Sequence, residues 1–311
     1  MTSTMQTAVL IHCYNEESTI GAVVRDFSAS LPDAAIYVYD NNSTDRTRWA
    51  AGAAGAIVRS EPQQGKGYVV CRMLADIDAD VYVLVDGDAT YDASSAPGMI
   101  ERLRTGQLDM VNGARIATGS AAYRPGHQFG NVLLTGMVAQ IFGNRFSDML
   151  SGYRVFSRRY VKSFPALTSG FEIEIAITTH ALELRMPVPE METLYKERPE
   201  GSASKVRTFR DGFRILWMIF RLVEEERPMQ LFGMLSLVFA LTSIVLAYPI
   251  LVTFIETGLV PRLPTAVLSA SLMVLACLSL TSGLIIDMVT LGRREAKRLC
   301  YLGLAAPSVR P

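Results

Sequence analysis

Two long uncharged segments near the end of the chain limit what it can fold into more than any other feature. Residues 231–255 and residues 264–286 contain 25 and 23 residues, carry no charged side chain, and are separated by a short loop. A helix needs about 20 apolar residues to cross the hydrocarbon core of a bilayer. One such segment could be a buried core helix, but two in succession predict a pair of transmembrane helices.

Basic residues flank these segments unevenly. The loop between them holds a single basic residue, Arg262, whereas four Lys and Arg residues lie in the stretch 293–298 that follows the second segment. Because basic flanks stay in the cytoplasm, we expect both termini inside and the tip of the hairpin outside. The N-terminus shows no basic-then-apolar signal peptide, so residues 1–230 are predicted to be cytoplasmic. The protein would then be integral to the inner or plasma membrane.

The first 115 residues alternate short apolar strands with helical stretches, which predicts a mostly parallel α/β sheet covered on both faces. The strands are expected at residues 8–13, 35–40, 56–59, 81–86 and 110–112. Helical patterns between them begin near residues 17, 44, 65 and 94, and later ones cover residues 126–143 and 171–184. We therefore assign residues 1–206 to one cytoplasmic α/β domain.

Residues 207–223 have a different pattern. Drawn as a helix, four Arg side chains fall within an arc of about 60°, and large apolar side chains occupy a broad face roughly opposite. Such a helix directly before a membrane span is predicted to lie in the lipid interface, although a helix packed on the α/β domain would show the same pattern. The expected organisation is thus an interfacial helix and linker over 207–228, then a two-helix membrane hairpin with a basic tail over 229–311.

Acidic residues terminate one of the predicted strands. Five apolar residues, 81–85, run directly into Asp86-Gly87-Asp88. Ligands of open α/β sheets bind beyond the carboxyl ends of such strands. Two carboxylates there suit a hard divalent cation that shares its coordination with phosphate oxygens. The sequence therefore predicts Mg²⁺ or Mn²⁺ at Asp86 and Asp88.

Polar clusters also follow the three preceding strands, at residues 12–17, 40–45 and 64–67. Each alone could be a turn or a solvated loop. Residues 64–67, with two glycines around Lys66 at a helix start, combine free backbone N–H groups with a cation and so suit a phosphate. Because the carboxyl ends of parallel strands meet at one edge of the sheet, the clusters together predict a single site.

These motifs resemble those of the family 2 glycosyltransferases, which have the GT-A fold, over about residues 6–206. Residues 14–17 are similar to the end of the family's P-x-Y-N-E-E, with His12 at the place of the usual proline. Similar correspondences hold for D-D-G-S-T-D, N-x-G-K-G and D-x-D at residues 40–45, 64–67 and 86–88. Residues 148–154 match the D-x-x-S-G-F-R of the polyprenyl-phosphate sugar synthases, the branch of dolichyl-phosphate mannose synthase, and residues 198–205 resemble its basic C-terminal loop.

The resemblance implies roles on the donor side of the site. The residues expected to hold the nucleotide are Tyr14, Glu16, Asp40 and Lys66. Asp86 and Asp88 would hold the metal ion on the diphosphate. In the mannose synthases a Gln two places after the second Asp also binds metal, and this chain has Thr90 there. The third protein ligand and the choice between Mg²⁺ and Mn²⁺ therefore stay open.

The resemblance also implies roles on the acceptor side. Basic residues would gather around the acceptor phosphate: Arg115, Arg124, Arg198 and Lys205. Asp148 and Arg154 would shape the site between donor and acceptor. The residues expected closest to the chemistry are Asp88, Arg115, Asp148 and Arg154. A phosphate monoester, with a second pKa of about 6, is largely dianionic at neutral pH and needs little help from a base, so no histidine is nominated.

The predicted reaction is an inverting, metal-dependent transfer of a sugar from a nucleotide-sugar to a membrane polyprenyl phosphate. UDP-glucose or UDP-GlcNAc is preferred as donor, because residues 40–42 and 86–90 differ from the corresponding sequence motifs of the mannose synthases. The alternative is a membrane glycosyltransferase with a glycolipid or polysaccharide acceptor, as in the synthesis of cell-envelope glycans. A catalytically silent sugar-nucleotide-binding module is a third reading. No nucleic-acid partner is predicted, and the sequence leaves open whether the protein is a homo-oligomer.

Overall fold

The computed structural model of the chain describes residues 5–117, 148–165, 173–196 and 223–307, together with residues 136, 217, 220 and 221. Three of the predicted site residues, Arg124, Arg198 and Lys205, lie outside the described residues. So do almost all of the predicted interfacial helix over 207–223 and of the helix expected over 126–143. Their roles stay predictions.

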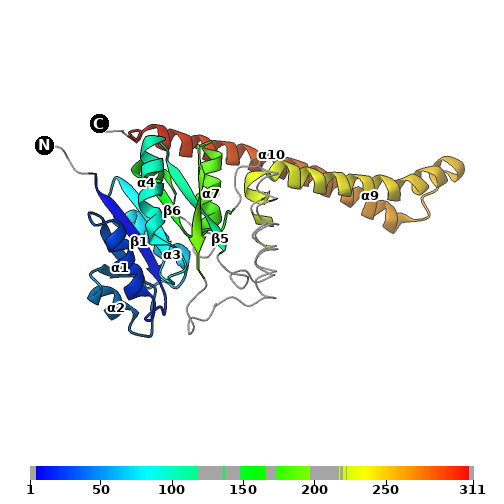
Figure 1. Cartoon of the computed structure of the whole chain (residues 1–311). Helices are drawn as coiled ribbons and strands as arrows, with labels where there is room; N and C mark the ends of the chain where they lie inside the picture. Colours follow the sequence, from blue (N-terminus) through cyan, green and yellow to red (C-terminus); the bar gives the residue numbers. More distant parts are fainter. Residues whose placement is uncertain are drawn as a thin grey trace. The chain divides into compact units, whose positions relative to one another are not determined.

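The described strands form one sheet in the order β3-β2-β1-β4-β6-β5-β7 (Figure 1). The strands are β1 (Thr7–Cys13), β2 (Ala35–Asp40), β3 (Ile57–Ser60), β4 (Val81–Asp86), β5 (Met110–Ala117), β6 (Arg154–Ser157) and β7 (Glu190–Tyr195). β6 runs antiparallel to its neighbours β4 and β5, and the other pairings are parallel. The predicted mostly parallel α/β sheet is confirmed.

Helices cover both faces of this sheet. α1 (Ile20–Ser30) and α4 (Ala96–Thr105), with the short η1 (Ala93–Ser95), share one buried cluster with alternate residues of the central strands, among them Val9, Ile11, Val83 and Val85. The intervening strand residues, such as Leu10 and Leu84, are equally buried and face the other way. On that side α3 (Lys66–Asp76) packs against β1, β2 and α7 (Ile173–Glu183). Two shorter helices are α2 (Thr47–Ala53) and α6 (Arg158–Ser163).

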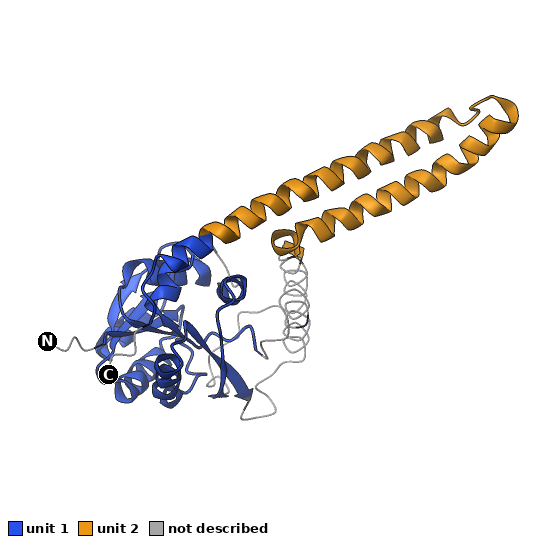
Figure 2. Cartoon of the chain, turned by 90° about the horizontal axis from the view of Figure 1, so that it is seen from above, with its two compact units in different colours: residues 1–215, 297–311 blue, residues 216–296 orange. Residues whose placement is uncertain are grey.

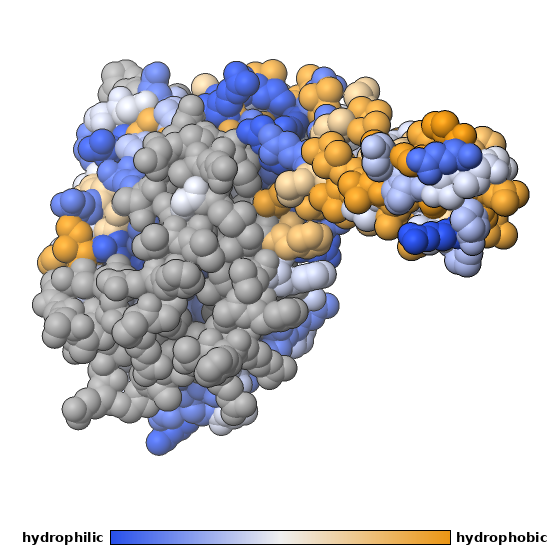
Figure 3. Space-filling model, turned by 90° about the vertical axis from the view of Figure 1, so that its right-hand side faces the viewer, coloured by the Kyte–Doolittle hydropathy of each residue, from blue (hydrophilic) through white to orange (hydrophobic). Residues whose placement is uncertain are grey.

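The chain divides into two compact units (Figure 2). Residues 1–215 and 297–311 form the first, here called the α/β unit, and residues 216–296 form the second, here called the helical hairpin. The hairpin consists of α9 (Pro228–Thr257) and most of α10 (Leu263–Leu302). Both helices are long and apolar enough to cross a membrane, and much of the hairpin surface visible in Figure 3 is hydrophobic.

Hydroxyl groups and one ion cluster join the two helices of the hairpin. Ser243 Oγ donates to the Ser269 carbonyl at 2.7 Å, and Ser269 Oγ donates back to the Ser243 carbonyl at 3.0 Å. At the other end of the hairpin, the buried Glu226 carboxylate accepts a 2.6 Å bond from Arg294, with Arg293 3.5 Å away. The apolar helices are thus joined by a few polar contacts between their facing sides.

The last turn of α10 belongs to the α/β unit. Lys297 Nζ lies 2.5 Å from Oε2 of Glu183, whose side chain is fully buried at the end of α7. The Tyr301 hydroxyl donates to Asp109, at 2.7 Å, and the Arg159 guanidinium lies over the Tyr301 ring. Asp109 directly precedes β5, so this turn packs at the edge of the sheet opposite the carboxyl ends of the parallel strands. The α/β unit is therefore completed by residues from the far end of the chain.

Candidate active site

The predicted clusters meet at the carboxyl ends of β1, β2 and β4. In the register of the sheet, Cys13 is paired with Asp40 and His12 with Asp86. The loops that leave these strands therefore begin side by side. The structure therefore brings these clusters together at one edge of the sheet.

The loops after β1 and β2 are joined by hydrogen bonds. Asn15, which has a positive φ of 52°, donates its N–H to Ser43 Oγ, and its side-chain oxygen accepts from the Thr44 N–H, both at 2.8 Å. The Glu16 N–H donates to Thr47 Oγ1, also at 2.8 Å. Glu16 is buried and Tyr14 half-buried. These bonds hold the first and second motifs as one surface.

Asn41 connects the second motif to the third. The buried Asp40 carboxylate accepts from the Ser43 N–H and closes the turn after β2. Asn41 Oδ1 accepts from the Gly65 N–H at 2.8 Å, and Asn41 Nδ2 donates to the Glu61 and Gln63 carbonyls. The second motif therefore fixes the start of α3, where Lys66 stands.

Lys66 is buried between two carboxylates. Its Nζ lies 2.6 Å from Asp86 Oδ1 and 2.6 Å from Glu174 Oε1, while His12 Nδ1 is 3.8 Å from Asp86 Oδ1. Burial lowers the pKa of Lys66, but the charges of Asp86 and Glu174 outweigh burial and raise it above its usual value. Burial raises the pKa of Asp86, but Lys66 and His12 outweigh it and hold that pKa well below its usual range. Lys66 and Asp86 are therefore an ion pair.

The second acid of the motif, Asp88, is oriented by the residue two places on. Asp88 Oδ1 accepts from the Thr90 N–H at 3.2 Å and from Thr90 Oγ1 at 2.6 Å. Gly87 lies so close to β1 that a Cβ there would be 3.1 Å from Cys13 Cβ and from the His12 carbonyl oxygen. Thr90, at the place of the Gln of the mannose synthases, thus orients Asp88.

The structure shows why the motif at residues 148–154 has glycine at position 152. A Cβ at Gly152 would lie 2.6 Å from Asp86 Oδ2, closer than real Cβ contacts allow. The Gly152 N–H donates to the buried Tyr91 hydroxyl at 2.8 Å. The loop of residues 148–154 therefore approaches Asp86 directly, and glycine is required because of the space that this carboxylate takes.

Arg115 and Asp148 form a bidentate ion pair. Arg115 Nε donates to Asp148 Oδ2 at 2.6 Å and Nη2 donates to Oδ1 at 2.7 Å, and the guanidinium lies over the Tyr195 ring. Glu190 accepts from the Asp148 N–H and from Asn112 Nδ2. Asp148 therefore fixes the orientation of Arg115 and occupies the Nε and Nη2 edge of its guanidinium.

Arg154 lies behind this surface, with no exposed area. It donates to the carbonyls of Ser151 and Met149 and to Thr178 Oγ1, at 2.6–3.0 Å. Burial lowers its pKa. In the structure Arg154 fastens the 148–154 loop to α7, so any part it takes in the chemistry is through the position of that loop.

The donor set fits a hard divalent cation in part. Two carboxylates, Asp86 and Asp88, stand at the end of β4, and oxygen ligands suit Mg²⁺ or Mn²⁺. Among the described residues there is no group of three His, Cys, Asp or Glu side chains that could hold a metal ion. A metal at this place would complete its shell with water and phosphate oxygens, as Mg²⁺ commonly does.

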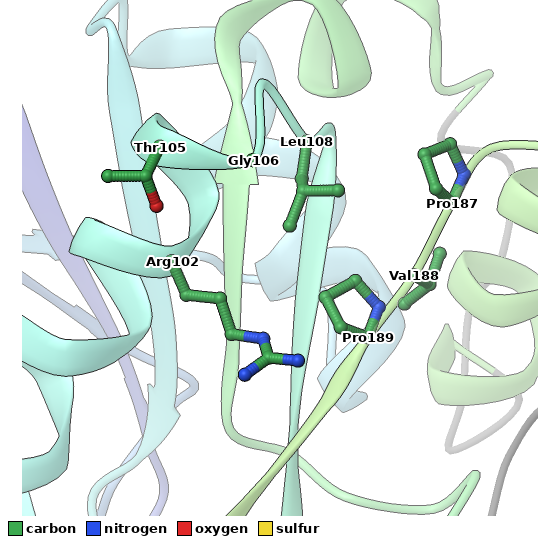
Figure 4. A pocket seen from close by; sticks show the side chains of 7 residues that line it. All are labelled: Arg102, Thr105, Gly106, Leu108, Pro187, Val188 and Pro189. Atoms are coloured by element: carbon green, nitrogen blue, oxygen red, sulfur yellow. The ribbon is translucent and has the colours of Figure 1, made fainter.

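An open hollow of about 600 Å³ lies away from this chemistry (Figure 4). Arg102 at the end of α4 and the segment 187–189 before β7 contribute to its lining. Leu108, also on its wall, precedes β5, which places the hollow at the edge of the sheet opposite Asp86. No cluster of acids or cations accompanies Arg102 in this lining, and we assign the hollow no part in the site.

The structure adds residues that the sequence analysis missed. Glu174 faces Lys66 from α7, Asn41 braces the third motif, and Tyr91 supports the loop at Gly152. Asn41 lies inside the predicted cluster at residues 40–45, so the sequence could have indicated its role. Glu174 is one acid in an apolar helical stretch, and nothing local in the sequence connects it to Lys66.

Comparison with known proteins agrees with this geometry. The family described as "Glycosyl transferase family 2" matches residues 8–164. The chain belongs to glycosyl transferase family 2. Glycosyltransferase AglJ of Haloferax volcanii is 30% identical over 298 residues, which cover 94% of this chain and 96% of AglJ. A dolichyl-phosphate hexose transferase of the same organism is 28% identical over 71% of this chain and 95% of its own.

Solved structures show the same fold. Glucosyl-3-phosphoglycerate synthase from Mycobacterium tuberculosis, in complex with Mn²⁺, UDP-glucose and phosphoglyceric acid, superposes with a TM-score of 0.58 and 23% identity. The match covers 72% of this chain and 80% of that one. The predicted GT-A fold is confirmed, and the protein is a family 2 glycosyltransferase with two long apolar helices.

Proposed function

We propose that this glycosyltransferase moves a sugar, glucose or GlcNAc, from a UDP-sugar to a polyprenyl phosphate in the membrane. The observation that carries the proposal is the meeting of Asp40, Lys66, Asp86 and Asp88 at one sheet edge, in a chain that also has two helices long enough to cross a bilayer. The dolichyl-phosphate hexose transferase relative and the neighbour that binds Mn²⁺ and UDP-glucose support it.

On the donor side, Tyr14, Glu16 and Asp40 bind the base and ribose in this proposal. Asp86 and Asp88 hold Mg²⁺ or Mn²⁺, which, when bound, offsets the charge that develops on the departing diphosphate. Lys66 stands near the nucleotide and, almost completely buried, holds Asp86 in place.

On the acceptor side, the phosphate of the lipid attacks the anomeric carbon. Its second pKa of about 6 leaves it largely dianionic at neutral pH, so it needs a binding site more than a base. Arg115, oriented by Asp148, supplies a cation of the right geometry, and Arg124, Arg198 and Lys205 are assigned to the same role. A single displacement inverts the anomeric centre.

The hairpin anchors the enzyme in this proposal, with both termini and the α/β unit on the cytoplasmic side. A polyprenyl chain would lose about 0.8 kcal/mol for each CH₂ brought into water, so the enzyme has to work at the bilayer surface. The basic residues at 293–298 fit a cytoplasmic flank.

The test is transfer by the purified full-length chain in detergent or nanodiscs. Radiolabelled UDP-glucose and UDP-GlcNAc are offered with undecaprenyl or dolichyl phosphate and either Mg²⁺ or Mn²⁺, and the label is expected in the lipid extract as a single-sugar product. Asp88→Asn should reduce the rate by about 100-fold or more, and the matched variant Asp26→Asn, at an exposed position of α1, should not.

Three outcomes would contradict the proposal or a part of it. Absence of transfer from any common sugar nucleotide to either lipid, with a folded enzyme, would count against the polyprenyl acceptor. A ladder of longer products would instead indicate a glycolipid or polysaccharide acceptor. Unchanged transfer by Asp88→Asn would remove the metal site from the mechanism.

A further inference from the structure

Among the described residues, Lys66 has two acidic partners at equal distance, and one of them belongs to the Asp-x-Asp motif. Nζ is 2.6 Å from Asp86 Oδ1 on β4 and 2.6 Å from Glu174 Oε1 in the first turn of α7. The side chains of Lys66 and Glu174 are almost completely buried, and that of Asp86 is about one quarter exposed. A buried cation is therefore shared between an acid that can face a metal and an acid set deeper in the domain.

The position of Glu174 is well supported. Thr178 Oγ1 donates to the Glu174 carbonyl at 2.9 Å, and Arg154 Nη1 donates to Thr178 Oγ1 at 2.8 Å. Arg154 also holds the carbonyls of the loop whose Gly152 approaches Asp86. The loop of residues 148–154 and the first turn of α7 are thus held together, with Lys66 between Glu174 and Asp86.

Glu174 affects metal binding because Lys66 and a divalent cation are both attracted to the Asp86 carboxylate. The Lys66 ammonium and a divalent cation at the motif would compete for the same carboxylate, that of Asp86. Glu174 offers Lys66 a second partner, and its negative charge lowers the electrostatic cost of bringing a divalent cation near Lys66. Without that charge, Lys66 would interact with Asp86 alone.

We propose that Glu174 is a positioning residue that shares Lys66 with Asp86, weakens the hold of the ammonium on this carboxylate and so keeps it available to a divalent cation. The inference rests on the metal-dependent function proposed above and adds a residue outside the Asp-x-Asp motif to its metal site. Glu174 acts through Lys66 and does not itself contact the cation.

The test is Mn²⁺ binding by the full-length protein in detergent, without donor or acceptor, followed by the electron paramagnetic resonance signal of free Mn²⁺. Glu174→Gln keeps the shape of the side chain and removes its charge, and Mn²⁺ should bind about tenfold more weakly. Lys66→Met removes the competing cation, and Mn²⁺ should bind at least as tightly as in the wild type. The matched control Glu101→Gln, an exposed acid on α4, should leave the affinity unchanged.

The double variant Lys66→Met/Glu174→Gln separates positioning from a direct role. If Glu174 acts through Lys66, the double variant binds Mn²⁺ as Lys66→Met does, because the group that Glu174 positions is gone. A loss of about tenfold between Lys66→Met and the double variant would show that Glu174 acts on the cation directly and would overturn the inference. This comparison also decides the matter if Glu174→Gln alone does not fold, since the double variant buries neither charge.

The failure of this inference differs from the failure of the proposed function. If the wild type binds Mn²⁺ and Glu174→Gln binds it equally well, Glu174 is only structural and the metal-dependent function stands. If the wild type does not bind Mn²⁺, the metal site at Asp86 and Asp88 is wrong, and the role of Glu174 is wrong with it.

Discussion

The α/β unit packs most of its large apolar side chains inside, whereas the helical hairpin exposes many of them. The α/β unit buries charges in pairs, as at Lys66 with Asp86 and at Glu183 with Lys297. The hairpin exposes large apolar side chains along both helices, and Val245 near the middle of α9 is 70% exposed. The first unit is organised for water outside and ion pairs inside, whereas the second has an exterior that suits lipid.

This difference between the units predicts which substitutions destabilise each of them. A buried ion pair that loses one partner leaves an uncompensated charge, which costs several kcal/mol. An exposed apolar side chain in a lipid-facing helix is sensitive mainly to the introduction of charge. The predictions below test this contrast, from the largest expected effect to the smallest.

The largest effect is expected where the end of the chain completes the α/β unit. Lys297→Met removes the ammonium that lies 2.5 Å from the buried Glu183 carboxylate, which costs about 3–5 kcal/mol and lowers the melting temperature by on the order of 10 °C in detergent. The double variant Glu183→Gln/Lys297→Met should recover part of the loss, because it leaves no buried charge. Equal melting temperatures of wild type and Lys297→Met would mean that the terminal turn does not support this unit.

The next prediction concerns the hairpin. Val245→Arg places a charge near the middle of α9, and insertion should become less favourable by about 2.5–3.5 kcal/mol if the helix spans the bilayer. The fraction of protein that resists alkaline extraction from membranes measures this. Leu259→Arg, in the loop between the two helices and equally exposed, is the control and should change little. If both variants resist extraction as the wild type does, α9 is not in the hydrocarbon.

A third prediction is a pH dependence that arises in the α/β unit. Burial, and then the charge of Lys297, lower the pKa of His180 from 6.5 to about 3. Between these values the unfolded chain binds a proton at this residue and the folded chain does not, so stability falls as the pH falls through that window. The slope is up to about 1.4 kcal/mol per pH unit.

The change His180→Gln isolates this contribution. The variant cannot titrate at position 180, so its unfolding free energy should fall less than that of the wild type between pH 6.5 and pH 5, measured by denaturant unfolding in detergent. Parallel pH profiles for the two proteins would show that His180 is protonated as easily in the folded as in the unfolded state.

The smallest effect is expected between the helices of the hairpin. Ser243→Ala removes one interhelical hydrogen bond to Ser269, a loss of about 0.6 kcal/mol by the average for membrane helices. Ser271→Ala is a matched control, because the Ser271 hydroxyl donates to the carbonyl of Val267 in its own helix. A thermal shift larger for Ser271→Ala than for Ser243→Ala would contradict the packing of α9 on α10.

Much of the α/β unit could be predicted from local patterns. The strands over 35–40 and 81–86 have the predicted bounds, and the strand over 8–13 begins one residue earlier. The strand predicted over 56–59 is shifted by one residue at both ends, and the one predicted over 110–112 covers only the first three residues of β5. Two strands were missed. β6 has four buried residues that include Arg154, and β7 alternates acids with apolar residues on the edge of the sheet, so neither shows a continuous apolar run.

The sequence predicted which motif residues form the candidate site, but it did not predict the contacts between them. Motif residues at strand ends, such as Asp40 and Asp86, could be brought together from the sheet rule alone. The bidentate pairing of Arg115 with Asp148 could not, because it depends on how the 148–154 loop returns to β5. The requirement for glycine at 152 likewise arises from a carboxylate that is distant in the sequence.

The sequence by itself determined the class of each unit: two apolar helices, an α/β sheet, and acids at its carboxyl edge. Hydropathy and periodicity report which face of an element is buried, and they need only neighbours along the chain. Tertiary structure alone decided which acid shares Lys66, which loop presses on Asp86, and which turn covers Glu183. Such contacts join residues far apart in the sequence, and their strength depends on burial and distance, which only the folded chain sets.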